Sequence, residues 1–151
     1  MTVSAFEHPF LSGLLGDEEV SRLLSPEAEI TAMLAFEAAL ATAQAKSGLI
    51  PDASAQAIAA ACASFSPDIA KLKQATARDG VVVPELVRQL RSAIGGEAAP
   101  HVHFGATSQD VIDTALMLRL KSVAALLSGR LQDLAERFGE LDRANGSRAM
   151  M

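Results

Sequence analysis

A long, unbroken apolar stripe in the last third of the chain limits the possible folds more than any other feature. Apolar residues recur there in alternating steps of three and four, the spacing of one helix face. They are Ile112, Leu116, Leu120, Val123, Leu127, Leu131, Leu134, Phe138 and Leu141. A helix from Ser108 to Arg143 would be ~54 Å long at ~1.5 Å per residue. A compact domain of this chain length has a radius of gyration of only about 15 Å. We therefore expect additional helices, from elsewhere in the protein or from other subunits, to cover the stripe.

Start and stop signals divide the preceding residues into four more helices. Starts are predicted at Ser25–Pro26, at Asp52 or Ser54, at Ser66–Asp68 and at Pro84, and stops at Gly48, Gly80 and Gly95. Residues 81–83 are three valines and are interpreted as a short extended segment, and residues 95–105 as a loop. No run of alternating strands is present, so the sequence predicts an all-α fold.

Composition excludes several classes of function. The 151 residues contain no Trp or Tyr and carry a net charge of -5, which argues against a nucleic-acid partner. An anionic substrate would have to be held by local donors. A lone Cys62, no signal peptide and no apolar run of ~20 residues favour a cytoplasmic protein that does not span a membrane.

The segment from His101 to Thr114 carries the candidate chemistry. Thr107 or Ser108 is placed to cap the long helix, and Thr107 with Asp110 approximates a capping box. The same helix start suits a ligand carboxylate, because free backbone N–H groups and the positive end of the helix dipole lie there. His103 is close enough in sequence to add a hydrogen bond or a proton.

Acidic residues follow at once on the helix. Asp110 and Asp113 are three residues apart, a spacing that favours capping and orienting neighbouring groups over paired acid and base work. His101 and His103 lack a third ligand at a suitable spacing, so no metal site is predicted.

The string His103-Phe-Gly-Ala-Thr-Ser-Gln-Asp-Val-Ile-Asp-Thr114 resembles the first signature region of the fumarase/aspartase superfamily. Its Ala-Thr-Ser-Gln-Asp form resembles the carboxymuconate cycloisomerase branch. Residues 36–41 are similar to that branch's first long helix, and residues 83–90 to the segment leading into the signature. The resemblance covers nearly the whole chain.

The resemblance implies a fold, an assembly and a reaction. Residues 1–105 would form a helical N-terminal domain, and residues 106–151 would begin the central helical bundle of a homotetramer. Members need no cofactor in this interpretation, and their substrates are small polycarboxylates. Thr107, Ser108 and Gln109 would bind a substrate carboxylate, with His103 as a catalytic candidate and Asp110 and Asp113 as orienting residues. The branch closes a lactone ring from a carboxymuconate in protocatechuate breakdown, the β-ketoadipate pathway.

Departures from the superfamily pattern leave alternatives open. A β-elimination of the adenylosuccinate lyase kind is a second reading. It is disfavoured because those lyases have an Arg-His-Asp segment, with an important histidine, near the place where this chain has Arg78-Asp79-Gly80. The second signature (Gly-Arg-Thr-x-x-Gln) and the third (Gly-Ser-Ser-x-Met-Pro-x-Lys) are not present. We therefore expect a piece of a longer protein that is inactive alone. A non-catalytic helical oligomerisation module is the third reading.

Overall fold

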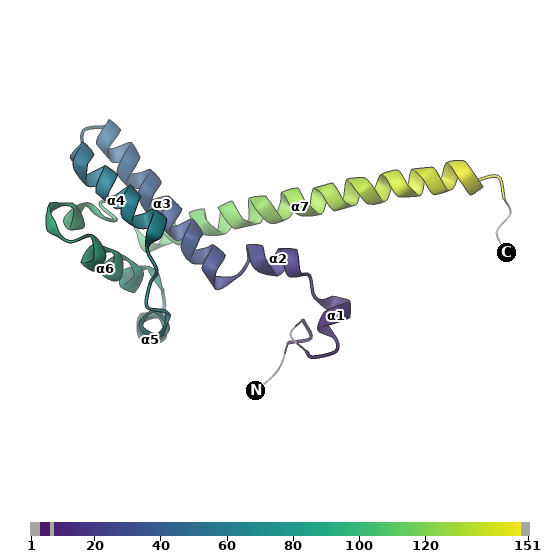
Figure 1. Cartoon of the computed structure of the whole chain (residues 1–151), viewed down its shortest axis with the longest axis horizontal. Coiled ribbons are helices and arrows are strands. Elements are labelled where there is room, and N and C mark those ends of the chain that lie inside the picture. Colours follow the sequence, from purple (N-terminus) through teal and green to yellow (C-terminus); the bar gives the residue numbers. More distant parts are fainter. Residues whose placement is uncertain (1–3, 7, 149–151) are drawn as a thin grey trace. The chain divides into compact units, whose positions relative to one another are not determined.

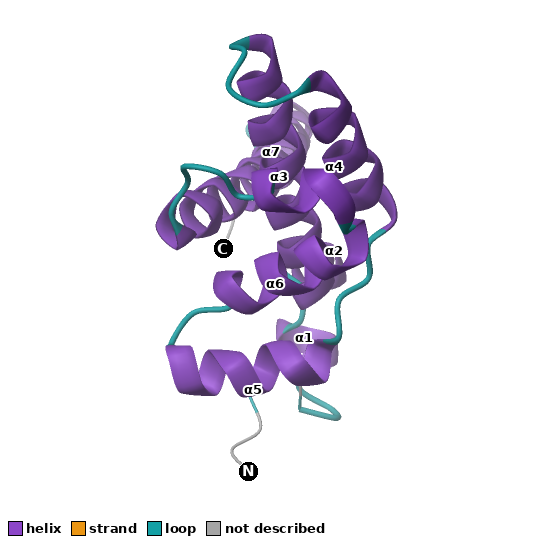
Figure 2. Cartoon of the chain, turned by 90° about the vertical axis from the view of Figure 1, so that its left-hand side faces the viewer, coloured by secondary structure: helices purple, strands orange, loops and turns teal. Residues whose placement is uncertain are grey.

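The computed structural model describes residues 4–6 and 8–148, and these residues form helices joined by loops, without a strand (Figures 1 and 2). The predicted all-α class is confirmed. In chain order the helices are α1 (Ser12–Leu15), α2 (Glu18–Leu23), α3 (Pro26–Lys46), α4 (Asp52–Ser64), α5 (Ile69–Asp79), α6 (Val83–Ile94), the 3-10 helix η1 (Gly96–His101) and α7 (Ser108–Asn145). None of the described helices is both long enough and apolar enough to cross a membrane.

Contacts divide the chain into two units. One unit is Leu24–Leu118, and the other joins Met1–Leu23 to Arg119–Met151 as far as these ranges are described. The long helix α7 contributes to both units. The domain boundary expected between residues 105 and 106 marks the start of a helical bundle. It stays a prediction.

The Leu24–Leu118 unit contains the hydrophobic core. Helix α3 packs against α4, α4 packs against α6 and η1, and α6 packs against α5 and η1. Met33, Ile58, Leu86 and Leu90 are almost completely buried between these helices. Each such side chain contributes about 1.5–3 kcal/mol when fully buried. The core therefore fixes α3, α4 and α6, the helices that surround the candidate site.

Several predicted helix ends are confirmed. The Ser25 hydroxyl accepts a hydrogen bond from the Ala28 N–H at 3.2 Å, with Pro26 as the first residue of α3. Gly80 ends α5 with φ at 79°, a left-handed conformation that favours glycine. Gly95 follows the last residue of α6.

Other local predictions were wrong. Neither Asp52 nor Ser54 caps α4, because Pro51 occupies the cap position and both residues lie inside the helix. Asp68, rather than Ser66, caps α5 by accepting from the Lys71 N–H. The predicted extended segment at 81–83 fails because Val83 is already the first residue of α6.

Three short helical segments were missed, for physical reasons. The loop expected at residues 95–105 contains η1, and neither α1 nor α2 was predicted. All three are 6 residues or shorter. A helix this short shows too little periodicity to be recognised from its sequence.

Helix α7 is continuous over 38 residues, which confirms the predicted long helix. Within it only Val111 and Ala115 are buried. The stripe remains largely uncovered: Leu131 is 65% exposed and Phe138 is 61% exposed. At 3.6 residues per turn, Val111 and Ala115 lie roughly 130° around the helix from the centre of the stripe. The chain thus covers a different face of α7 from the one that carries the stripe.

In the second unit, an ion-pair cluster joins α7 to the segment around α2. Arg130 donates hydrogen bonds to the carboxylates of Asp17 and Glu19. Asp17 also accepts from the Val20 N–H at 3.1 Å and so starts α2. The Arg130 guanidinium is the main reason that the pKa of Asp17 falls to about 2. These contacts make Arg130 the link between the two helical segments of this unit.

Candidate functional site

The start of α7 is a reciprocal cap made by Thr107 and Asp110. The Asp110 carboxylate accepts from the Thr107 N–H at 2.8 Å and from the Thr107 hydroxyl at 2.7 Å. The Thr107 hydroxyl oxygen accepts in turn from the Asp110 N–H at 3.3 Å. This is a capping-box arrangement with Asp in place of the usual Glu or Gln. Because its proton points to Asp110, the Thr107 hydroxyl is occupied as a donor.

Ser108 differs from its neighbour in having free donors. Among the described residues, no group bonds the Ser108 hydroxyl, and none accepts from the backbone N–H of Ser108 or Gln109. The first N–H groups of a helix have no partner inside the helix and carry the positive end of its dipole. These three donors therefore lie at the helix start without a partner among the described residues, and an anionic oxygen bound there could accept from them.

Gln109 and Asp113 form a separate pair on another face of the helix. The Gln109 side-chain amide donates to the Asp113 carboxylate at 2.6 Å, one turn along α7. At 100° per residue, the Gln109 side chain lies roughly a quarter turn or more from that of Ser108. Within this chain, Asp113 therefore orients the amide of Gln109 away from the Ser108 donors. Substrate binding by the Gln109 side chain stays a prediction.

His103 is held by a buried acid from a distant part of the sequence. Its Nδ1 lies 2.7 Å from Oε1 of Glu37, whose residue is only 2% exposed on α3. The His103 side chain is 14% exposed. His103 also has a φ of 57°, the one positive φ at a non-glycine position among the described residues. Such a conformation persists only where surrounding contacts fix it.

The chain segment around His103 is fixed by three more side chains. Gln44 on α3 donates to the Phe104 carbonyl at 2.6 Å, and Arg91 on α6 donates to the Val102 carbonyl at 2.8 Å. His101 Nδ1 lies 3.0 Å from the Ser54 hydroxyl on α4. His101 is half-buried against that hydroxyl. Segment 101–104 is therefore fastened to three different helices.

The electrostatics of the helix start are mixed. The pKa of Asp110 is lowered, first by the Thr107 N–H, then by the Thr107 hydroxyl, and also by the charge of His103. Asp110 thus stays ionised and places a negative charge beside the Ser108 donors. A bound carboxylate would need positive charge from His103 or from outside this chain to balance Asp110.

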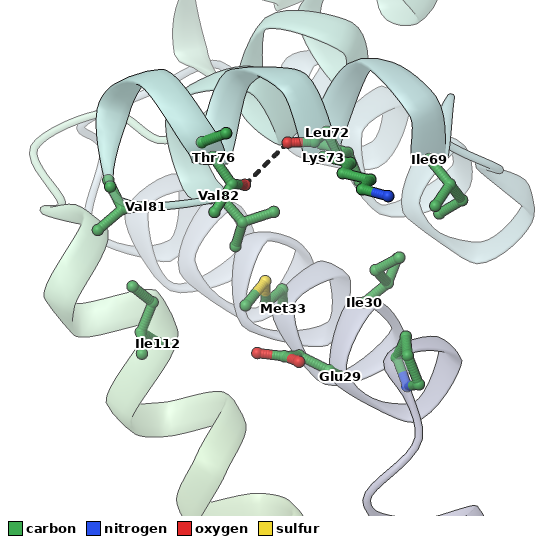
Figure 3. A pocket seen from close by; sticks show the side chains of 13 residues that line it. Glu29, Ile30, Met33, Ile69, Leu72, Lys73, Thr76, Val81, Val82 and Ile112 are labelled. Atoms are coloured by element: carbon green, nitrogen blue, oxygen red, sulfur yellow. Dashed lines mark hydrogen bonds between the residues drawn. The ribbon is translucent and has the colours of Figure 1, made fainter. Parts of the chain in front are cut away.

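An apolar pocket lies beside this site and has different chemistry. It has a volume of about 620 Å³ and is walled by apolar side chains of α3 and α5, with Met33 and Leu72 among them (Figure 3). Glu29 and Lys73 supply its charges, and Ile112 contributes from α7. Ser108 is one helical turn before Ile112 and so shares that side of α7. With one cation in its lining, the pocket fits a hydrocarbon surface better than a polycarboxylate.

The structure brings His103, Thr107, Ser108 and Asp110 together and leaves the Gln109–Asp113 pair to one side. Sequence reasoning missed the residues that hold the segment, above all Glu37. A glutamate inside an alanine-rich helix at an otherwise buried position was the available signal. Among the described residues, no three His, Cys, Asp or Glu side chains are grouped so that they could hold a metal ion.

Comparison with known proteins places this geometry in a family. A family model described as a lyase matches residues 15–151. The chain belongs to this lyase family of the fumarase/aspartase superfamily. It is 38% identical over 146 residues to a 3-carboxy-cis,cis-muconate cycloisomerase of Bradyrhizobium diazoefficiens, covering 95% of this chain and 32% of that relative.

Two further lyase-family relatives bear on fold and function. The crystal structure of a 3-carboxy-cis,cis-muconate lactonizing enzyme from Pseudomonas putida is 39% identical with a TM-score of 0.76, covering 80% of this chain and 28% of that one. An adenylosuccinate lyase of Methanocaldococcus jannaschii is 32% identical over 121 residues, covering 80% of this chain and 26% of that relative. The chain spans about a third or less of the length of these proteins.

Proposed function

We propose that this chain forms the N-terminal part of a 3-carboxy-cis,cis-muconate cycloisomerase. The observation that carries the proposal is its 38% identity to such an enzyme over 95% of the chain. The matched region includes the His103–Asp113 motif, folded as a helix start with free donors at Ser108. The enzyme would act as an intramolecular lyase of the β-ketoadipate pathway and would use a homotetramer to complete each site.

The proposed reaction explains why donors, rather than a nucleophile, are needed. One carboxylate oxygen of the substrate adds to a carbon of its own C=C bond and closes the lactone ring. The π electron pair moves to the adjacent carbon, which takes up a proton. The remaining carboxylates must be held still while negative charge develops. In this proposal the Ser108 hydroxyl and the N–H groups of Ser108 and Gln109 hold one of them.

An adenylosuccinate lyase-like β-elimination is the second candidate, supported by the relative from Methanocaldococcus jannaschii. Local geometry argues against it. By resemblance, Asp79 stands near the place of the lyase histidine, and its carboxylate accepts from the Arg78 guanidinium at 2.7 and 2.9 Å. The Arg78 guanidinium lowers the pKa of Asp79. An ionised, paired carboxylate does not replace a histidine that donates a proton.

A pair of assays tests the function. The complete polypeptide encoded by the reading frame that contains residues 1–151 is incubated with 3-carboxy-cis,cis-muconate and, separately, with adenylosuccinate. We expect lactone from the first and no fumarate from the second. Fumarate alone would favour the second candidate, and turnover of neither would favour the non-catalytic helical module.

The 151-residue chain by itself supplies a second test. We expect it not to turn over carboxymuconate, because the other two signature regions are not in it. Lactonisation by the purified chain would show that the catalytic groups have been placed wrongly.

A further inference from the structure

Glu37 is a buried acid without an evident structural purpose. Its residue is 2% exposed, and its Oε2 is buried without a hydrogen-bond partner among the described residues. Burying a carboxylate is costly unless it is paired and fully hydrogen-bonded. An apolar residue of similar size would fill this place in α3 without that cost. The one hydrogen bond that Glu37 makes through its side chain is to His103.

The His103 ring has one nitrogen engaged and one free. Nδ1 faces Glu37 at 2.7 Å. No described residue bonds Nε2, and Nε2 is not among the buried atoms that lack a partner. An ionised carboxylate can only accept, so Nδ1 carries the proton of this hydrogen bond when Glu37 is ionised. The lone pair or the second proton of the ring is then presented at Nε2.

The backbone around His103 is fixed independently of the ring. Gln44 and Arg91 hold the carbonyls on either side, at Phe104 and Val102. These two hydrogen bonds already hold the backbone of the segment, so Glu37 is not needed for that purpose. What Glu37 adds is control over the orientation and the protonated nitrogen of the imidazole.

We propose that Glu37 is a positioning residue for His103. It accepts the Nδ1–H hydrogen bond, fixes that tautomer, and presents Nε2 to the substrate beside the start of α7. In the neutral ring Nε2 accepts a proton, and in the charged ring it donates a hydrogen bond to an anionic oxygen. The catalytic consequence rests on the proposed function, whereas the tautomer does not.

Nitrogen-15 NMR of the 151-residue chain tests the tautomer directly. The chain has three histidines, so His8→Gln and His101→Gln variants assign the His103 ring signals. At a pH where the ring is neutral, we expect Nδ1 to be the protonated nitrogen and Nε2 the unprotonated one. In Glu37→Gln the side-chain amide can donate as well as accept, so the Nε2–H tautomer should gain population. Wild-type His103 in the Nε2–H form would overturn the proposal, as would a Glu37→Gln spectrum identical to that of the wild type.

Kinetics of the complete polypeptide test the role. We expect Glu37→Gln to lower kcat roughly ten- to a hundred-fold, the scale of losing a well-placed group, with KM changed less. Glu27→Gln is the matched control, because Glu27 is an exposed acid on the same helix, and its kcat should equal the wild-type value. A Glu37→Gln enzyme with wild-type kcat would refute the positioning role. A wild-type polypeptide that turns over no carboxymuconate would refute the proposed function and leave the NMR result standing.

Discussion

The two adjacent hydroxyls at the start of α7, those of Thr107 and Ser108, differ in their hydrogen bonds, and this suggests different roles for them. The Thr107 hydroxyl donates a hydrogen bond to the Asp110 carboxylate and accepts one from the Asp110 N–H. Ser108 has no such partner among the described residues, and its own N–H is also free. A residue that already makes its hydrogen bonds stabilises the helix. A residue with unused donors at a helix start is suited to a ligand. We therefore expect Thr107 to contribute to stability and Ser108 to ligand binding.

Substitutions at these two positions should separate stability from catalysis. Thr107→Ala removes the cap and should lower the free energy of unfolding of the 151-residue chain by typically ~1 kcal/mol. Ser108→Ala should stay within about 0.5 kcal/mol of the wild type. In the complete polypeptide, Ser108→Ala should lower kcat/KM roughly ten- to a hundred-fold, because hydrogen bonds to charged groups contribute roughly 1.5–3 kcal/mol.

Thermal denaturation and steady-state kinetics measure the two effects. Ser108→Gly serves as a second variant, since it also lacks the hydroxyl, and it should lose most of the activity while keeping most of the stability. Wild-type kinetics in both Ser108 variants would rule out a carboxylate site at this position.

At the scale of elements, what could be predicted from the sequence was local. The stripe repeats every three or four residues, and the Thr107–Asp110 box spans four positions, so both α7 and its cap could be recognised. Glu37 and His103 are 66 residues apart, and a single sequence does not show which distant side chain a helix will bring to a histidine. The Asp17–Arg130 pair, 113 residues apart, was missed for the same reason.

The link between α2 and α7 should weaken in acid. The pKa of Asp17 is lowered from 3.8 to about 2, mainly by the Arg130 hydrogen bonds. A lowered folded-state pKa means that the stabilisation is complete above about pH 4. It is lost as the pH falls through about 2, when the folded carboxyl also binds a proton.

Comparison with Arg130→Gln isolates this effect. The difference in melting temperature between the wild type and Arg130→Gln should be largest near pH 6 and shrink toward pH 2. Arg137→Gln, at an exposed position on the same helix, should show no such convergence. A wild-type advantage over Arg130→Gln that is equal at pH 2 and pH 6 would contradict the assignment.

At the scale of the whole chain, the exposed apolar stripe of α7 is unfavourable in free energy while it stays in contact with water. Large apolar side chains from Leu116 to Leu141 are between 37% and 65% exposed. Among the described residues of α7, only Val111 and Ala115 are buried. Side chains of this size contribute about 1.5–3 kcal/mol each when fully buried. Burial of this surface by helices from outside the described residues would therefore be favourable. The proposed homotetramer would supply such helices.

Association of the 151-residue chain can be measured by sedimentation. We expect a mass above the 15.8 kDa of a single chain and a shift toward the monomer in Leu131→Glu, since a charge would be buried at the contact. Gln132→Glu adds the same charge roughly 150° around α7 from the centre of the stripe and should associate like the wild type. A wild-type chain that remains monomeric at high concentration would count against the stripe as a contact surface.

The order in which the chain is made has a consequence for segment 101–104. The side chains that hold this segment, Glu37, Gln44, Ser54 and Arg91, all precede it in the sequence. Synthesis runs from the N-terminus, and segments made early can fold before later ones exist. When His103 leaves the ribosome, every residue that holds it has already been made. The histidine can therefore take up its position while most of α7 is still inside the ribosome.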